Sequence, residues 1–175
     1  QVTNPPIDSL RENEVMSLKT RFGNLGNILD FENLTKDNIY VLESPILSNS
    51  QFKKFTMFFK NSLRVLDCTF DVQNNLKKRL DQLCSEAEIA VREGCKHLIL
   101  SDKQLSEKKA AIPMTLAFGA INSRLVNLGI RGFVSINVQT GEVLDTHSFA
   151  VLLGVGATTI NPYLVFDSIY QRYEK

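Results

Sequence analysis

The sequence has few of the residues that build the commonest metal and covalent sites. It contains three cysteines and two histidines among 175 residues. Cys68, Cys84 and Cys95 are widely spaced, without a CxxC pair or two nearby histidines. This pattern excludes a zinc ligand set and a disulfide framework, and it is typical of reduced thiols in the core of an intracellular protein. A GxSxG elbow, a Walker loop and an HExxH motif are also absent, which sets aside three classes of enzyme.

A strong net charge and a long apolar segment are missing as well. Twenty Lys and Arg residues against nineteen Asp and Glu leave a formal charge of +1, so no overall field favours nucleic acid or an anionic membrane as a partner. No apolar run approaches the ~20 residues that cross a bilayer, and the first residues do not resemble a signal peptide. Because the chain begins with glutamine, we expect it to be a piece of a longer polypeptide, whose remaining sequence can hold targeting information.

What the chain does have is a 43% hydrophobic share and a regular alternation of β-type and helical segments. A capping-box pattern at Ser48 and Gln51 predicts a helix that runs to about Lys60. Beyond it, the periodicity predicts strands at 65–70, 98–100, 133–138 and 157–160. It predicts helices from 76 to the glycine at 94, at 113–128, from 145 or 146 to the glycine at 154, and at 163–173.

This alternation predicts parallel β-α-β units with right-handed crossovers. Four units are too few to close an eight-stranded barrel. The expected fold is therefore α/β with a mostly parallel sheet, open or an incomplete (β/α) barrel, in a single domain over residues 1–175. Residues 1–45, in which Pro5 and Pro6 precede a possible helix cap at Asp8 or Ser9, are expected to form a helical arm and a connection. Residues 46–175 are expected to form the α/β core.

Polar residues follow the predicted strands, at the edge where ligands bind in parallel α/β sheets. They are Asp67, Ser101, Asp102, Asn137, Gln139 and Asn161, with Pro162 beside the last. Asp102 follows the buried strand LILSD directly and is the best placed to bind a ligand or act as a base. Residues such as Ser101 and Asp102 also hydrogen-bond their own loops, and we regard this structural role as the more frequent one. A stand-alone small-molecule enzyme with a site at Asp102 and Asn161 is one alternative.

Three other features allow both a functional and a structural interpretation. Gly154 and Gly156 resemble a phosphate loop, but they follow a helix and precede a strand, which favours helix termination. His147 lies beside a helix N-terminus, where a neutral ring is favoured, and is predicted to be packed and hydrogen-bonded. The phenylalanine-rich segment 52–59 is predicted to fill the core or an interdomain contact rather than a cofactor site.

Four strings carry a family resemblance: QVTNPPIDSLRE at 1–12, CSEAEIAVREG at 84–94, LILSD at 98–102 and THSFAVLLGVGATTINPYL at 146–164. Together they resemble the central domain of glutamate synthase, a large multidomain flavoenzyme, and the resemblance covers nearly the whole chain. The family commonly has arginine where this chain has Lys103, a histidine at Ser148, and a run of histidines at Asn122, Ser123 and Arg124. Any histidine-based role at these places is therefore not expected here.

The resemblance implies a non-catalytic domain that joins a glutamine amidotransferase domain to an FMN domain and helps enclose an ammonia tunnel. The parent enzyme would convert L-glutamine, 2-oxoglutarate and a reductant into two L-glutamate, with FMN and an iron–sulfur cluster held in other domains. No catalytic, cofactor-binding or metal-binding residue is then expected here, and the location would be the cytoplasm, or a plastid for a ferredoxin-dependent parent. The candidate interdomain or strand-end positions are Asn4, Asp8, Arg11, Ser101, Asp102, His147 and Asn161. A non-enzymatic interaction scaffold is the second alternative.

Overall fold

The computed structural model describes residues 16–23, 29 and 39–173. The chain divides into two compact units, 1–45 and 46–175, and each is described by itself. In the first unit, strands β1 (Thr20–Phe22) and β2 (Tyr40–Leu42) form an antiparallel pair. Met16 and Leu18, two residues of the helix expected in the arm, lie outside any helix, and the rest of that expected helix falls outside the described residues.

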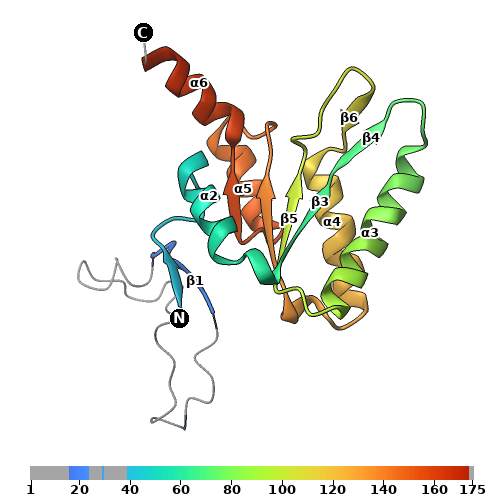
Figure 1. The fold of residues 1–175 in the computed structure, drawn as a ribbon, viewed down its shortest axis with the longest axis horizontal. Coiled ribbons are helices and arrows are strands. Elements are labelled where there is room, and N and C mark those ends of the chain that lie inside the picture. The colour runs from blue at the N-terminus through green and yellow to red at the C-terminus, as the bar shows by residue number, and fades with distance from the viewer. Residues whose placement is uncertain (1–15, 24–28, 30–38, 174–175) are drawn as a thin grey trace, which may run out of the picture. The chain divides into compact units, whose positions relative to one another are not determined.

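The second unit is built on a four-stranded parallel sheet (Figure 1). Its strands stand side by side in chain order: β3 (Leu63–Asp67), β5 (His97–Ser101), β7 (Ser135–Gln139) and β8 (Thr159–Asn161). With this order, right-handed crossovers place the connecting helices on one face of the sheet. The prediction of an α/β fold with an open, mostly parallel sheet is confirmed.

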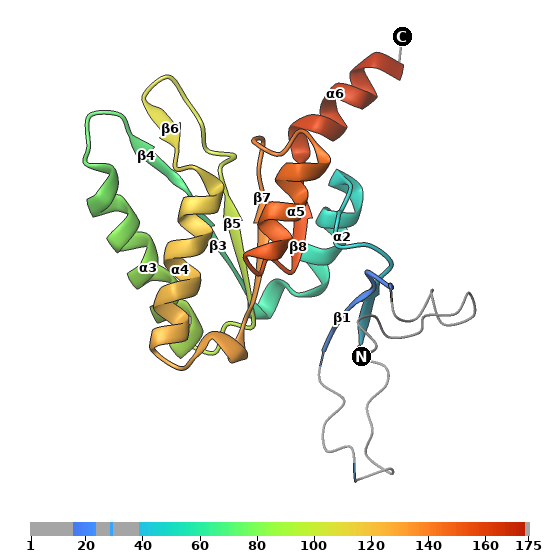
Figure 2. The same ribbon diagram turned by 180° about the vertical axis from the view of Figure 1, so that it is seen from behind.

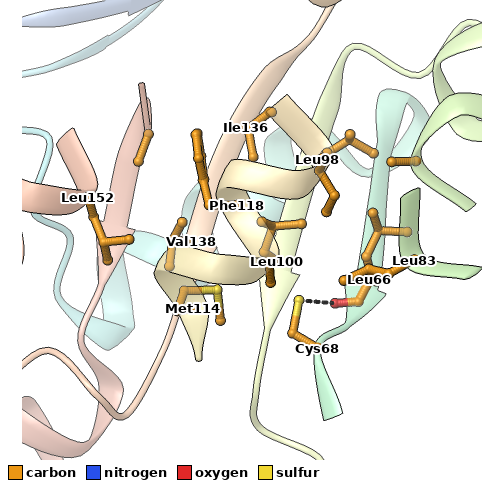
Figure 3. Packing of buried hydrophobic residues seen from close by; sticks show 14 of the residues in the cluster. Leu66, Cys68, Leu83, Leu98, Leu100, Met114, Phe118, Ile136, Val138 and Leu152 are labelled. Carbon is orange, nitrogen blue, oxygen red and sulfur yellow. Dashed lines mark hydrogen bonds between the residues drawn. The ribbon is translucent and has the colours of Figure 1, made fainter. Parts of the chain in front are cut away.

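One face of the sheet is covered by α3 (Leu76–Arg92), α4 (Met114–Asn127) and α5 (Thr146–Gly154), as Figure 2 shows. Their apolar sides pack on strand residues that point to this face, among them Leu66, Leu98, Leu100, Ile136 and Val138 (Figure 3). Ile160 belongs to the same cluster. The hydrophobic core lies between the two layers. Gly94 and Gly129, just beyond α3 and α4, have φ angles of 89° and 70°. Glycine adopts this left-handed conformation readily, which explains why both helices end where the sequence predicts.

Helix α2 (Asn49–Phe58) lies on the opposite face of the sheet. The predicted capping box is confirmed, since the Ser48 side chain accepts from the Gln51 N–H and the Gln51 side chain accepts from the Ser48 N–H. The rings of Phe55 and Phe59 pack against the His97 ring with centroid distances of 5.9 and 4.1 Å. Phe58, in contrast, is exposed. The phenylalanine-rich segment therefore divides between core packing and the surface.

A two-stranded antiparallel ribbon, β4 (Thr69–Asp71) with β6 (Lys109–Ala111), extends beyond the carboxyl ends of β3 and β5 (Figure 1). The single strand predicted at 65–70 is broken at Cys68, whose N–H donates to the Ser101 carbonyl at 2.8 Å. The 3₁₀ turns η2 (Lys60–Ser62) and η3 (Arg131–Phe133) precede β3 and β7. Helix α6 (Tyr163–Tyr173) follows β8. None of the helices described is long and apolar enough to span a membrane.

Candidate functional site at the carboxyl edge of the sheet

Three polar side chains stand in register across the carboxyl ends of β5, β7 and β8. Ser101 Oγ donates to Gln139 Oε1 at 3.0 Å, and Gln139 Nε2 donates to Asn161 Oδ1 at 3.1 Å. Asn161 Nδ2 in turn donates to the Leu47 carbonyl at 3.0 Å and to Asn49 Oδ1 at 2.9 Å. A continuous chain of hydrogen bonds therefore runs across three strands to the first residues of α2.

A second polar row lies one layer deeper on the same face. Asn137 is fully buried, and its Oδ1 accepts from Thr159 Oγ1 at 2.8 Å. Its Nδ2 donates to Ser135 Oγ at 3.1 Å and to the Leu98 carbonyl at 3.2 Å. Burying such groups is costly unless they are hydrogen-bonded. In the described part of the chain, no buried side-chain nitrogen or oxygen lacks a partner.

Asp102, the strongest candidate from the sequence, is 1% exposed and is directed at the neighbouring loop. Its Oδ2 accepts from Thr140 Oγ1 at 2.5 Å and from the Gly141 N–H at 3.0 Å. The Tyr163 hydroxyl lies near this carboxylate, and burial together with the negative charge of Asp102 raises the pKa of Tyr163 to about 12. All these contacts fix the β7–α5 loop and the start of α6. Asp102 therefore serves as an anchor between loops, whereas Ser101 does bond its own loop, through the Lys103 N–H.

Two further contacts tie the same loops together, and neither was visible in the sequence. Pro113 precedes α4 and provides no side-chain cap, but Glu142 Oε2 accepts from the Met114 N–H at 2.8 Å. The Lys103 ammonium lies 5.4 Å from the centroid of the Tyr163 ring, a distance at which cation–π attraction operates. The charge of Lys103 is thus attracted to the Tyr163 ring, a contact that does not need the bidentate geometry of an arginine.

A groove of about 610 Å³ lies beside these strand ends. It is lined by residues of α2, the sheet, the loop after β5 and α6, namely Asn49, Phe52, Lys53, Thr56, Leu63, Val65, Ile99, Lys103, Gln139, Asn161 and Asp167. Its floor is partly apolar, and Val65 there is 55% exposed. The Asp167 carboxylate accepts from Asn49 Nδ2 at 2.7 Å. The groove can accept a polar segment or a small molecule. Among the described residues its lining holds no cysteine, serine or histidine, and its carboxylate, Asp167, is hydrogen-bonded to Asn49.

The two histidines differ in their surroundings. His97 is 7% exposed and its Nδ1 lies 2.8 Å from Ser135 Oγ, and burial lowers its pKa from 6.5 to about 4. His147 is exposed on the first turn of α5, so the prediction that it is packed was wrong. The cap of this helix is Asp145, whose Oδ1 accepts from the Ser148 N–H at 2.8 Å and from Ser148 Oγ at 2.7 Å. The hydroxyl of Ser148 therefore supports the helix start.

Two other positions at which the resemblance leads us to expect histidine also have structural partners. Asn122 Oδ1 accepts from Arg131 Nε at 2.7 Å, which ties α4 to η3. Arg124 Nη2 donates to Glu88 Oε2 at 2.8 Å, which ties α4 to α3. Gly154 is the last residue of α5, so the glycine pair terminates a helix as predicted. Among the candidates from the sequence, Asn4, Asp8 and Arg11 lie outside the described residues.

The cysteines are free and do not converge on one another. Cys68 Sγ donates to the Leu66 carbonyl at 3.7 Å, and burial raises its pKa to about 12. Cys95 Sγ donates to the His97 carbonyl at 3.3 Å, and burial raises its pKa as well. Thiols with raised pKa values are poor nucleophiles and poor ligands, because the thiolate is the reacting form. No group of three or more His, Cys, Asp or Glu side chains able to hold a metal occurs within residues 16–23, 29 and 39–173.

Because the pKa of His97 is lowered on folding, we expect stability to fall as the pH drops below 6.5 towards 4. The unfolded chain then binds a proton that the folded chain resists. The expected loss between pH 7.5 and 5 is about 2 kcal/mol. Urea unfolding of the wild type and His97→Gln at both pH values measures it. His147→Gln is the matched control, and a loss that follows His147 instead of His97 would contradict the assignment.

The fold and its edge define the class of protein: an open, parallel α/β domain whose strand-end polar groups hold the loops together. The glutamate synthase central domain family matches residues 1–175, and the chain belongs to this family.

Three relatives illustrate the extent of the match. The chain is 48% identical, over all of its length, to the glutamate synthase [NADPH] large chain of Azospirillum brasilense, of which the match covers 12%. It is 40% identical, over 98% of its length, to the chloroplastic ferredoxin-dependent glutamate synthase of Spinacia oleracea, of which 11% is covered. It is 37% identical over its whole length to the glutamate synthase [NADPH] large chain of Bacillus subtilis (strain 168), again 11% of that protein. The chain therefore spans a small part of each of these relatives.

Proposed function

We propose that this chain is the non-catalytic central domain of a glutamate synthase. In this role it joins the glutamine amidotransferase domain to the FMN domain and forms part of the wall of the ammonia tunnel between them. The parent enzyme assimilates ammonia from L-glutamine into 2-oxoglutarate, using a reductant, to give two L-glutamate. Membership of the central domain family and the 11–12% share of the relatives' length support this role.

The observation that carries the proposal is that the polar side chains at the carboxyl edge of the sheet are hydrogen-bonded to neighbouring loops and to α2. Catalytic groups of parallel α/β enzymes gather at this edge. Here the Asp102 carboxylate accepts hydrogen bonds from Thr140 and Gly141. The polar row from Ser101 to Asn161 is bonded to itself and to α2. The edge therefore favours a rigid support over a reaction centre.

The FMN and the iron–sulfur cluster of the parent would lie in other domains. The three cysteines sit on the β3–β4 junction, in α3 and before β5, and two of them donate to backbone carbonyls. This donor set does not fit a cluster, which needs several converging thiolates. A linker of this kind needs walls and fixed spacing instead of reacting groups, so that ammonia is kept from bulk water. The Spinacia oleracea relative is named chloroplastic, and we propose a cytoplasmic parent, or a plastid one if it is ferredoxin-dependent.

We expect the purified 175-residue chain to bind neither FMN nor NAD and to hydrolyse no glutamine. The physical reason is that the Asp102 carboxylate and the polar row from Ser101 to Asn161 are already hydrogen-bonded to neighbouring loops and to α2, which occupies them structurally. Equilibrium dialysis against FMN and NAD, and an ammonia-release assay with glutamine, measure this. The matched control for turnover is Asp102→Asn, which should leave any trace activity unchanged. About one equivalent of bound flavin, or turnover that Asp102→Asn abolishes, would favour the stand-alone enzyme instead.

A further inference from the structure

Helix α6 carries an apolar stripe of four residues, three of which the described residues leave exposed, while Phe166 is half-buried. Phe166, Ile169, Tyr170 and Tyr173 recur at the spacing i, i+3, i+4, i+7, which places them on one helix face. Ile169 is 44% exposed, Tyr170 48% and Tyr173 86%. An amphipathic helix in a globular protein normally buries such a face against other structure.

The start of α6 is fixed, while the rest of the helix projects away from the sheet (Figure 1, Figure 2). Tyr163 is buried, and the Lys103 ammonium lies 5.4 Å from the centroid of its ring. Asn49 Nδ2 donates both to the Tyr163 carbonyl at 3.3 Å and to Asp167 Oδ1 at 2.7 Å. These contacts hold the first turns on α2 and on the carboxyl edge. The stripe therefore begins at a rigid base and is presented in a defined direction.

Its composition suits a protein partner. Tyrosine and phenylalanine are enriched at the centres of protein interfaces because each buries a large area with few rotatable bonds. The polar face of the same helix carries Asp167, Ser168, Gln171 and Arg172, which suits the rim of a contact. The chain matches only 11–12% of its relatives' length, so a great deal of polypeptide is available to cover the stripe.

We infer that the stripe Phe166, Ile169, Tyr170 and Tyr173 docks against an apolar face of another segment of the same polypeptide, outside residues 1–175. This inference rests on the proposed function, since it requires a longer parent chain. Beyond the proposed function, the inference names α6 as the helix through which a neighbouring domain contacts the central domain. The contacts between the start of α6 and the carboxyl edge would then fix the position of that neighbouring domain relative to the sheet.

Hydrogen exchange of residues 163–173 tests the inference, measured in the 175-residue chain and in the longer polypeptide. We expect exchange in α6 to be at least about tenfold slower in the longer polypeptide, because docking protects a helix that otherwise frays. The double variant Ile169→Gln/Tyr170→Gln should abolish this slowing and increase the free ammonia released per glutamine hydrolysed. Ile89→Gln is the matched control, because Ile89 is a 56% exposed residue of α3. It should change neither quantity.

Equal exchange of α6 in both proteins would overturn the docking. Slow exchange of α6 already present in the 175-residue chain would also overturn it. Such slowing would indicate that residues 1–45 cover the stripe, or that a second copy covers it if exchange slows further as the protein concentration rises. The two proposals fail separately. If α6 is unprotected while the longer polypeptide still releases little free ammonia per glutamine hydrolysed, the docking is wrong and the linking role stands. Glutaminase or amination activity of the 175-residue chain would instead contradict the proposed function.

Discussion

Replacing Asp102 by alanine is expected to lower the free energy of unfolding by about 2–4 kcal/mol. The carboxylate is 1% exposed and accepts hydrogen bonds from Thr140 Oγ1 and the Gly141 N–H, so its removal leaves buried donors without a partner. Urea unfolding at pH 7, followed by circular dichroism, measures the loss. Asp102→Asn should lie between the wild type and the alanine variant, because the amide oxygen can still accept while the amide nitrogen faces other donors.

The control for this prediction is Asp81→Ala, since Asp81 is an exposed aspartate within α3. A surface substitution of this kind is expected to change stability by no more than about 0.5 kcal/mol. If Asp102→Ala were neutral or stabilising, the carboxylate would be a strained functional group instead of an anchor, because removing such groups often stabilises a protein. That result would revive the alternative of a small-molecule site at Asp102 and Asn161.

The second large effect is expected at Asn161, where alanine should cost about 2–3 kcal/mol. Asn161 is fully buried, and its side chain bonds Gln139, the Leu47 carbonyl and Asn49. Alanine would leave the Gln139 amide and the Leu47 carbonyl unsatisfied. Thermal unfolding measures the loss, with the exposed Asn127→Ala at the end of α4 as the control. Equal effects of the two substitutions would show that the polar row contributes nothing specific.

These two residues also link the sheet to α6. The Asp102 carboxylate lies near the Tyr163 hydroxyl at the start of the helix, and Asn161 bonds Asn49, whose amide donates to Asp167. Polar networks that are fully satisfied in a low-dielectric interior fix one arrangement of their members. In this domain, the edge at which related α/β folds bind ligands fixes the direction in which α6 leaves the body.

Local patterns in the sequence were sufficient for most of the elements. The alternation from Val65 onward predicted the parallel sheet, Ser48 and Gln51 predicted the start of α2, and the glycines predicted where α3 and α4 end. Each of these signals depends on residues a few positions apart, because helical and β periodicity and capping are short-range effects. The same reasoning missed β6 and the break at Cys68, since the pairing of β4 with β6 joins segments about forty residues apart in the chain.

The sequence by itself determined the α/β class, the family resemblance and the polar character of the strand ends. Only the tertiary structure decided what those polar groups contact. Asp102 meets Thr140 across 38 residues of chain, and Asn161 meets Leu47 across 114. His147, two residues beyond the cap at Asp145, is exposed although it was predicted to be packed. Which side chain satisfies a buried donor depends on the loops that the sheet brings together, and no pattern within a single segment contains that information.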